Sequence, residues 1–331
     1  MIRGQVMRAV IIGGTGHIGT YLTPRLVEAG LEVVNVSRTQ RQPYQPHVAW
    51  RQVRQVTLDR AVEEESGIFG EKIAELEPDI VIDLTCYLIE SARMLVESLR
   101  GRIRHFLHCG TIWVHGAPVE APTTEEQPRD PFGEYGCRKA AIEAYLLGEA
   151  RRSRFPATIL HPGHLVGVGW TPINPTGNFN PDVFSDLARG EEIPLPNLGR
   201  ECLHHVHADD VAQAFLASLN NWSSSVGESF HVVSPAALTL YGYARSVARW
   251  FGREARLKFL PWEQWKETVS EKDAQITWGH IAHSSNCSIR KARRLLGYQP
   301  RYTSLEAIHE SIFDRFADQC TIGNPEIGAR K

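Results

Sequence analysis

A tyrosine and a lysine stand four residues apart in the segment Tyr135-Gly136-Cys137-Arg138-Lys139. On a helix, side chains at this spacing share one face, so the ammonium can lie beside the phenol. A phenol has a pKa of about 10 and is a poor base at neutral pH, but a neighbouring cation favours the phenolate. Tyr135 could then exchange a proton with an alcohol or carbonyl oxygen. Such a pair also arises by chance, so its weight depends on the elements around it.

A glycine-rich segment near the N-terminus reads Gly13-Gly14-Thr15-Gly16-His17-Ile18-Gly19, directly after an apolar run. Gly13 allows a tight turn, Gly16 leaves room for a phosphate against backbone N–H groups, and Gly19 permits close packing of the next helix. The positive end of that helix faces the phosphates. We therefore predict a dinucleotide-binding loop whose contacts are Gly13, Thr15, Gly16, His17, Ile18 and Gly19.

The end of the second predicted strand bears on the choice of cofactor. NAD-binding folds usually place an acid there to bind the ribose 2′-hydroxyl, but this chain has Val36-Ser37-Arg38. A hydroxyl beside a guanidinium suits a 2′-phosphate, so Ser37 and Arg38 favour NADP over NAD. Asp59, at the end of the third strand, is a candidate for the adenine side, although Asp is also an ordinary turn residue.

The fifth predicted strand leads into the segment 108–116, which holds Thr111. Residues just beyond the carboxyl end of a parallel strand line the ligand crevice. We expect Thr111 to hydrogen-bond the reacting oxygen and orient it toward Tyr135. Further cofactor contacts are predicted at nearby strand ends: Leu84, Thr85, Cys109, His161 and Gly163. Tyr135 and Lys139 are expected to touch the cofactor as well as the substrate.

The elements that must position these side chains alternate between strand and helix patterns. Expected strands are 8–12, 32–36, 52–58, 80–84, 104–107 and 157–160, and expected helices are 18–29, 69–77, 90–99 and 132–152. This alternation implies right-handed crossovers and a parallel sheet. We predict an α/β fold, a Rossmann-type doubly wound parallel sheet with a smaller C-terminal substrate-binding part. The expected division is 7–166 for the nucleotide domain and 167–331 for the rest, with 203–233 returning to the sheet.

Composition limits the classes of partner. The chain has 331 residues, of which 42% are hydrophobic and 22% charged, and its formal net charge is −2. This balance gives no reason to expect a nucleic-acid or membrane partner. No apolar run reaches the ~20 residues of a membrane helix, and the first residues do not resemble a signal peptide. The six cysteines are scattered without a C-x-x-C pair, so a cytoplasmic protein without a disulfide framework is expected.

Taken together, these segments resemble the extended short-chain dehydrogenase/reductases of the NAD-dependent epimerase/dehydratase family. The resemblance covers roughly residues 8 to 317 and includes further blocks at 79–85, 161–167, 205–212 and 288–297. It implies that Thr111, Tyr135 and Lys139 match the family's Ser/Thr-Tyr-Lys triad. It also implies hydride exchange with a nicotinamide at a carbinol or carbonyl carbon of a sugar or sugar-like substrate, and a homodimer built on the helices that carry Tyr135 and residues 90–99.

The chain departs from the family where nucleotide-sugar members place arginines against the diphosphate. Leu203-His204-His205 stands at one such place and the segment 277–284 at the other, and neither contains an arginine. The loss would remove charge-assisted bonds to phosphate. Arg200 and Arg256 could compensate. The departure weighs against a standard UDP- or dTDP-sugar without excluding one.

Aromatic and histidine side chains supply the expected substrate contacts. Aromatic faces stack on sugar rings, although large apolar residues are more often core. The predicted contacts are Trp113, His164, Trp170, Asn178, His205, Trp278 and His283. A metal site is not expected from His204, His205 and His207, because alternation along a strand points His204 away from the other two.

Three functions stay open at this point. The first is an epimerase or dehydratase that uses transient oxidation by a retained NAD(P). The second is an NADPH-dependent carbonyl reductase or dehydrogenase with net redox turnover, which Arg38 favours slightly. The third is a non-catalytic NAD(P)-sensing or RNA-binding protein, which the intact Thr111, Tyr135 and Lys139 and the lack of a basic excess make less attractive.

Overall fold

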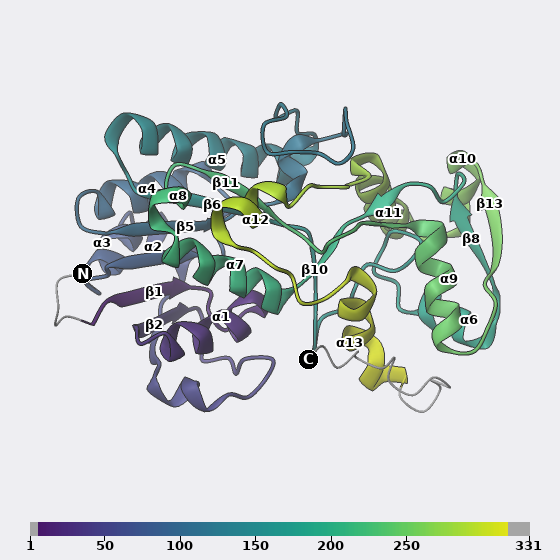
Figure 1. Cartoon of the computed structure of the whole chain (residues 1–331), viewed down its shortest axis with the longest axis horizontal. Helices are drawn as coiled ribbons and strands as arrows, with labels where there is room; N and C mark the ends of the chain where they lie inside the picture. Colours follow the sequence, from purple (N-terminus) through teal and green to yellow (C-terminus); the bar gives the residue numbers. More distant parts are fainter. Residues whose placement is uncertain (1–5, 317–331) are drawn as a thin grey trace.

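The computed structural model describes residues 6–316, and its centre is a seven-stranded parallel sheet (Figure 1). The strand order is β11-β6-β5-β4-β1-β2-β3. The strands are β1 (Arg8–Ile12), β2 (Glu32–Ser37), β3 (Arg54–Thr57), β4 (Ile80–Asp83), β5 (His105–Cys109), β6 (Ala157–Pro162) and β11 (Ser229–Val232). The order reverses between β1 and β4, and ligands of open α/β sheets bind outside the carboxyl ends of the strands at such a point.

Helices cover both faces of this sheet because its strands are apolar on both sides. Along β1, Ala9 and Ile11 pack into one core cluster, whereas Val10 and Ile12 pack into the other. The first face is covered by α1 (His17–Glu28), α7 (Ala208–Asn220) and α12 (Arg290–Leu296), and the second by α3 (Phe69–Ala74), α4 (Ile89–Leu99) and α5 (Gly133–Ser153). Two short helices, α2 (Arg60–Glu65) and α8 (Trp222–Ser225), complete this part.

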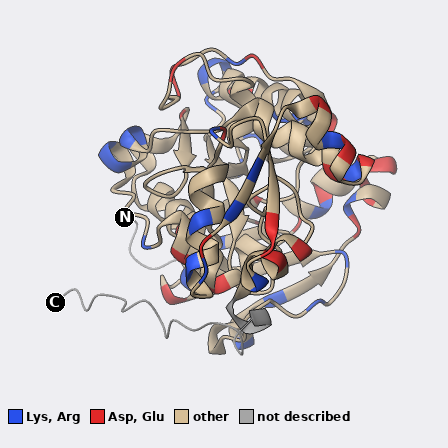
Figure 2. Cartoon of the chain, turned by 90° about the vertical axis from the view of Figure 1, so that its right-hand side faces the viewer, with Lys and Arg blue, Asp and Glu red and all other residues tan. Residues whose placement is uncertain are grey.

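A smaller C-terminal part extends beyond the sheet, at the right of Figure 1. It contains three two-stranded pairs: β7 (His164–Val166) with β10 (His205–His207), β9 (Cys202–Leu203) with β12 (Leu238–Thr239), and β8 (Glu192–Pro196) with β13 (Arg256–Leu260). Its helices are α6 (Asp182–Arg189), α9 (Leu240–Trp250), α10 (Trp262–Trp265), α11 (Glu271–His283) and α13 (Ser304–Phe316). These elements share a core of their own, which includes Phe184, Leu195 and Tyr243. Figure 2, which views the chain from this side, shows both basic and acidic positions distributed along the ribbon.

The predicted α/β fold with a parallel sheet is confirmed, and the predicted strands lie within a few residues of the observed ones. The third strand is shorter than expected because it forms the sheet edge and is mostly exposed. Of the segment 203–233, only β11 joins the central sheet, while β9 and β10 pair elsewhere. Among residues 6–316, no helix combines the length and apolar character needed to cross a membrane. The division at residue 166 stays a prediction.

Candidate active site

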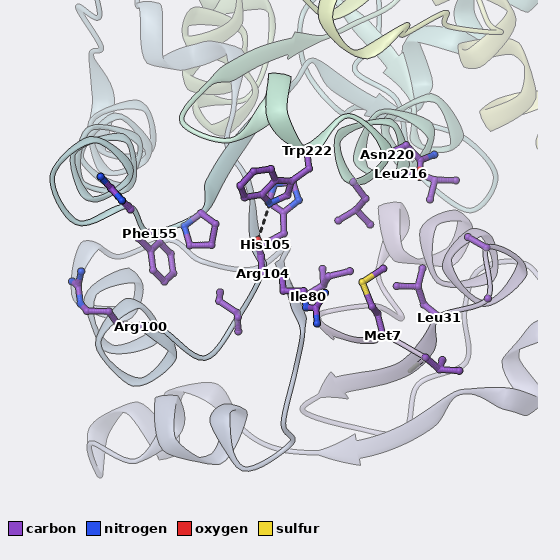
Figure 3. A pocket seen from close by; sticks show the side chains of 18 of the residues that line it. Met7, Leu31, Ile80, Arg100, Arg104, His105, Phe155, Leu216, Asn220 and Trp222 are labelled. Carbon is purple, nitrogen blue, oxygen red and sulfur yellow. Dashed lines mark hydrogen bonds between the residues drawn. The ribbon is translucent and has the colours of Figure 1, made fainter. Parts of the chain in front are cut away.

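Two cavities lie at opposite ends of the strands. The larger one, of about 1240 Å³, lies at the amino ends and is walled mainly by apolar side chains such as Leu31, Ile80 and Leu216 (Figure 3). Its Arg100 and Arg104 are paired with Glu149 and Asp79. The smaller one, of about 610 Å³, lies at the carboxyl ends and is lined by all three predicted catalytic residues. We therefore assign the chemistry to the smaller cavity, called the crevice below.

The glycine loop beside the crevice has the shape that a dinucleotide requires. Gly13 has φ of +91°, and a Cβ there would lie 2.5 Å from Thr85 Cγ2. A Cβ on Gly19 would lie 2.1 Å from the Gly14 carbonyl oxygen, so the helix–loop contact excludes any side chain. The N-cap of α1 is Gly16, which has no side chain to satisfy the N–H groups of the first turn. The residues present thus fit a phosphate-bearing cofactor.

The carboxyl end of β2 carries the cation predicted to bind the cofactor, and this side chain is exposed. Arg38 makes no ion pair with any side chain described in the range 6–312. Ser37 Oγ donates to the Thr39 carbonyl at 2.9 Å. Asp59 has a structural task, because it caps α2 by accepting a hydrogen bond from Ala61 N at 3.0 Å. The neighbouring Arg60 binds both carboxylate oxygens of Asp83. The contact of Asp59 with adenine stays a prediction.

Thr111 and Tyr135 meet on one wall of the crevice. Thr111 is the N-cap of the 3-10 helix η2 (Ile112–His115), and its hydroxyl accepts a hydrogen bond from Trp113 N at 3.3 Å. Tyr135 stands in the first turn of α5 and lines the open cavity with 42% of its surface exposed. Desolvation by the crevice walls nevertheless raises the pKa of the phenol, and a hydrogen bond with the Thr111 side chain partly opposes this rise.

Lys139 is buried one turn further along α5. Its Nζ donates to the Cys86 and Cys109 carbonyl oxygens at 2.8 and 2.7 Å, and lies 4.7 Å from the centre of the Tyr87 ring. Burial lowers the pKa of Lys139. The Lys139 ammonium is held by backbone carbonyl oxygens, and desolvation is the largest influence on the pKa of the Tyr135 phenol. The expectation that Lys139 favours the phenolate of Tyr135 stays a prediction. An ammonium has three donors, so one N–H remains for a ligand.

A buried network behind the crevice holds the Thr111 peptide. His161 Nδ1 accepts a hydrogen bond from Thr111 N at 3.0 Å, so its Nε2 carries the proton and donates to Glu143 Oε1 at 3.0 Å. Arg129 binds both Glu143 oxygens, at 3.1 and 2.7 Å. Burial raises the pKa of the Glu143 carboxyl, but His161 and Arg129 outweigh it, and the net shift is downward. The His161 ring therefore positions the Thr111 peptide, and both of its nitrogens are used by protein groups. The predicted contact of His161 with the cofactor stays a prediction.

Sequence reasoning missed Glu143 and Arg129. A signal for Glu143 was present, since it lies four residues after Lys139 and eight after Tyr135, on the same face of one helix. A Cβ on Gly110 would lie 2.4 Å from His161 Nδ1, so this glycine permits the close approach of the His161 ring to the strand end. Gly163 is likewise confined, because a Cβ there would lie 2.3 Å from the His204 carbonyl oxygen. Nothing in the sequence linked Arg129 to this helix.

The predicted substrate contacts divide into two groups. Trp113, His164 and Trp170 line the crevice, together with Phe179 and His280. The rings of Trp113 and His283 stack at 4.0 Å, and those of Trp170 and His17 at 4.7 Å. Four further predicted contacts do not line the crevice: Asn178, His205, Trp278 and His283.

Each of these four has a different environment from the one expected. Asn178 is buried in an amide–hydroxyl network and donates to Thr176 and Thr277. His205 is fully buried, and His283 supports Trp113 from behind while its Nδ1 donates to the Gly279 carbonyl. Trp278 is 52% exposed and its ring packs against another tryptophan outside the crevice. The structure thus places these side chains in supporting or surface positions, and their contact with a substrate stays a prediction.

The neighbouring histidines His204, His205 and His207 do not converge on one point. His204 Nδ1 accepts from Cys287 N and its Nε2 donates to the Ser234 carbonyl, whereas His207 caps α7 by accepting from Asp209 N. Within the described residues, no group of three His, Cys, Asp or Glu side chains is placed to hold a metal ion.

The remaining predicted contacts border the crevice or its glycine loop. Ile18, Leu84, Cys109 and Gly163 line the crevice directly. Thr85 packs against Gly13, and its backbone N–H donates to Asp83 Oδ1 at 3.1 Å. Thr15 is buried within the loop. The structure thus brings most of the predicted cofactor residues to the carboxyl ends of the sheet strands. Their contacts with a cofactor stay predictions.

Comparison with known proteins agrees with this geometry. A sequence model of the NAD dependent epimerase/dehydratase family matches residues 9–232. The chain is 25% identical to a dTDP-6-deoxy-L-talose 4-dehydrogenase (NAD(P)(+)) from Kitasatospora kifunensis over 92% of this chain and 94% of the relative. It is 24% identical to the chloroplast stem-loop binding protein of 41 kDa b from Arabidopsis thaliana over 92% of this chain and 78% of the relative.

A solved structure shares the fold. The UDP-glucose 4-epimerase from Thermotoga maritima, solved with UDP-glucose, superposes with a TM-score of 0.69 at 20% identity, covering 94% of this chain and 99% of that one. At this identity the likeness concerns the arrangement of the elements.

Proposed function

Because this chain belongs to the NAD-dependent epimerase/dehydratase family of extended short-chain dehydrogenase/reductases, we propose that it moves hydride at a hydroxyl- or carbonyl-bearing carbon of a sugar or sugar-like substrate. The observation that carries the proposal is the meeting of Thr111, Tyr135 and Lys139 in one crevice beside the glycine loop. When bound, a nicotinamide dinucleotide supplies the hydride acceptor or donor. The chain itself supplies orientation, proton transfer and shelter from water.

Tyr135 is the proposed proton carrier. As the carbinol carbon is oxidised, the phenolate oxygen takes the hydroxyl proton, and in reduction the phenol returns it to the carbonyl oxygen. The raised pKa of the phenol favours its neutral form, which is the form needed to donate the proton. Deprotonation for the oxidative direction therefore requires additional positive charge near the ring, which an oxidised nicotinamide carries.

Thr111 and Lys139 are the proposed orienting groups. The Thr111 hydroxyl lies next to Tyr135 and can hold the reacting oxygen, while its peptide is fixed by the Arg129–Glu143–His161 network. The remaining N–H of Lys139 can hold a ribose hydroxyl of the cofactor. Trp113 and Trp170 form walls that limit water around the reacting groups.

Arg38 supports NADP as the preferred cofactor. The guanidinium is exposed and has no ion-pair partner among the side chains described in residues 6–312, and Arg38 follows Ser37 at the end of β2. Its charge suits a 2′-phosphate better than a hydroxyl. This also keeps a second function in view, a reductase with net NADPH turnover. A homodimer through α4 and α5 is a further proposal that rests on the resemblance. A cytoplasmic location is also proposed, and it rests on the scattered cysteines.

The test begins with the purified protein. Absorbance and mass of any copurified nucleotide, followed by titration with NAD⁺, NADP⁺ and NADPH, measure cofactor binding. Incubation with sugars and nucleotide sugars, followed by NMR, measures turnover and shows whether NAD(P)H accumulates. Binding of NAD(P) with conversion of a sugar-like hydroxyl or carbonyl supports the proposal. Failure to bind either dinucleotide at millimolar concentration would contradict it.

A further inference from the structure

The crevice is lined by very few charged side chains. Among the described residues that line it, none is Asp, Glu or Arg, and the only cation is Lys139. Two of the three donors of that ammonium already bind backbone carbonyl oxygens. A diphosphate in this space would therefore lack the charge-assisted, bidentate partner that phosphate recognition normally uses. A cationic substrate would equally lack a carboxylate.

The histidines of the crevice do not replace that missing charge. His164 and His280 line the cavity, and burial lowers the pKa of both, that of His280 to about 4. His280 Nδ1 faces the Gly177 and Ile276 carbonyl oxygens at 2.8 and 2.9 Å, so this nitrogen carries the proton. Nε2 of His280 is then a lone-pair acceptor, which suits the hydroxyl group of a ligand.

The walls around these acceptors are aromatic. The Trp113 ring lies edge-on to His280, at 5.3 Å between ring centres, and is fixed from behind by stacking on His283. Trp170 and Phe179 add two further partly exposed rings. Flat apolar faces combined with neutral hydrogen-bond acceptors match a ring that has C–H faces and equatorial hydroxyls.

The two arginines that could compensate lie elsewhere. The Arg200 guanidinium stands over the Tyr241 ring, 5.4 Å from its centre, and Arg256 is an exposed residue at the start of β13. Neither lines the crevice. Neither arginine therefore supplies a positive charge to the wall of the crevice.

From this juxtaposition of aromatic walls, neutral imidazole acceptors and missing charge, we propose that the substrate is an uncharged, hydroxylated ring compound, such as a free sugar, a glycoside or a cyclitol, and not a nucleoside diphosphate sugar. The proposal rests on the proposed function, because it names the substrate class of that same crevice. It predicts that recognition does not depend on phosphate.

The experiment measures binding of UDP and dTDP to the NADP⁺-loaded full chain by calorimetry, beside turnover of methyl glycosides and cyclitols and of UDP-glucose and dTDP-glucose. We expect no UDP or dTDP binding tighter than about 1 mM. We also expect the KM for the neutral substrate to change less than about twofold between low and high salt, since no exposed charge pair holds it. Binding of UDP or dTDP below about 100 µM, competitive with substrate, would overturn the proposal.

Two variants give an independent readout. Arg200→Gln and Arg256→Gln are expected to leave kcat and KM unchanged, because neither side chain lines the crevice. If the substrate carried a diphosphate held by either cation, the KM would rise by about 10-fold or more, and that result would contradict the proposal. If the unmodified protein does not bind NADP⁺, that result counts against the proposed function. The UDP and dTDP titrations are then run on the unloaded chain, where binding below about 100 µM still contradicts the proposal.

Discussion

Removal of the Glu143 carboxylate tests the network that fixes the catalytic threonine. In Glu143→Ala, Arg129 loses a bidentate partner and the His161 Nε2–H is left in a fully buried position. Breaking a buried pair by removing one partner costs about 3–5 kcal/mol. Because His161 holds the Thr111 peptide, we also expect kcat to fall by about 100-fold, the size typical of a 1 Å misplacement of a reacting group.

Urea unfolding followed by tryptophan fluorescence measures the first effect, and steady-state turnover the second. Glu134→Ala is the matched control, since Glu134 lies on the same helix, pairs with Arg138 and has a 74% exposed side chain. The control should change stability by less than about 1 kcal/mol. Equal stability of the Glu143 and Glu134 variants, with normal turnover in both, would refute the role given to the network.

The remaining predictions concern acid, the cofactor and the phenol. Acid should unfold the protein well above pH 4, because burial lowers the folded-state pKa of six histidines to about 3 or 4. The unfolded chain then binds more protons below about pH 6.5, so stability is lost as the pH falls, by roughly 3 kcal/mol for each such histidine at pH 4. These six histidines are His17, His105, His115, His204, His205 and His280. A circular dichroism titration that shows native structure at pH 4 would contradict the prediction. Arg38→Gln should weaken NADP⁺ binding by about 10-fold, while NAD⁺ binding should change by less than about twofold. Fluorescence titration measures both affinities, with Arg51→Gln as the control. An equal loss of affinity for both dinucleotides would exclude a 2′-phosphate contact. In the oxidative direction the rate should increase up to at least pH 9, because deprotonation of Tyr135 is opposed by its raised pKa; a rate that is flat from pH 6 to 9 would remove Tyr135 as the base.

The nucleotide-binding half was largely predictable because its signals are local. The apolar run of β1, the glycine spacing and the start of α1 are contiguous in the sequence. The structure confirms a steric reason for Gly13 and for Gly19. Tyr135 and Lys139 share a helix face for the same reason, since a spacing of four fixes their relation. Thr111 follows directly after a buried strand, where crevice residues are expected.

The rest depended on contacts between segments far apart in the chain. Arg129 reaches Glu143 from a loop, and β8 pairs with β13 across more than sixty residues. Asn178 and His205 were predicted as substrate contacts, but the surrounding segments bury both side chains. The ammonium of Lys139 was expected to act on Tyr135, and only the positions of the Cys86 and Cys109 carbonyls show where it is held. Polarity alone does not tell a supporting side chain from a wall of the cavity.

The claim on which the account depends is that the Tyr135 oxygen carries the proton for hydride transfer in the crevice. The most direct measurement compares single-turnover hydride transfer and NADP⁺ binding in the unmodified protein and in Tyr135→Phe, which keeps the ring and removes only the hydroxyl. We predict that dinucleotide affinity stays within about twofold while the rate of hydride transfer falls by about 100-fold or more. A Tyr135→Phe protein that transfers hydride at the unmodified rate would contradict the account.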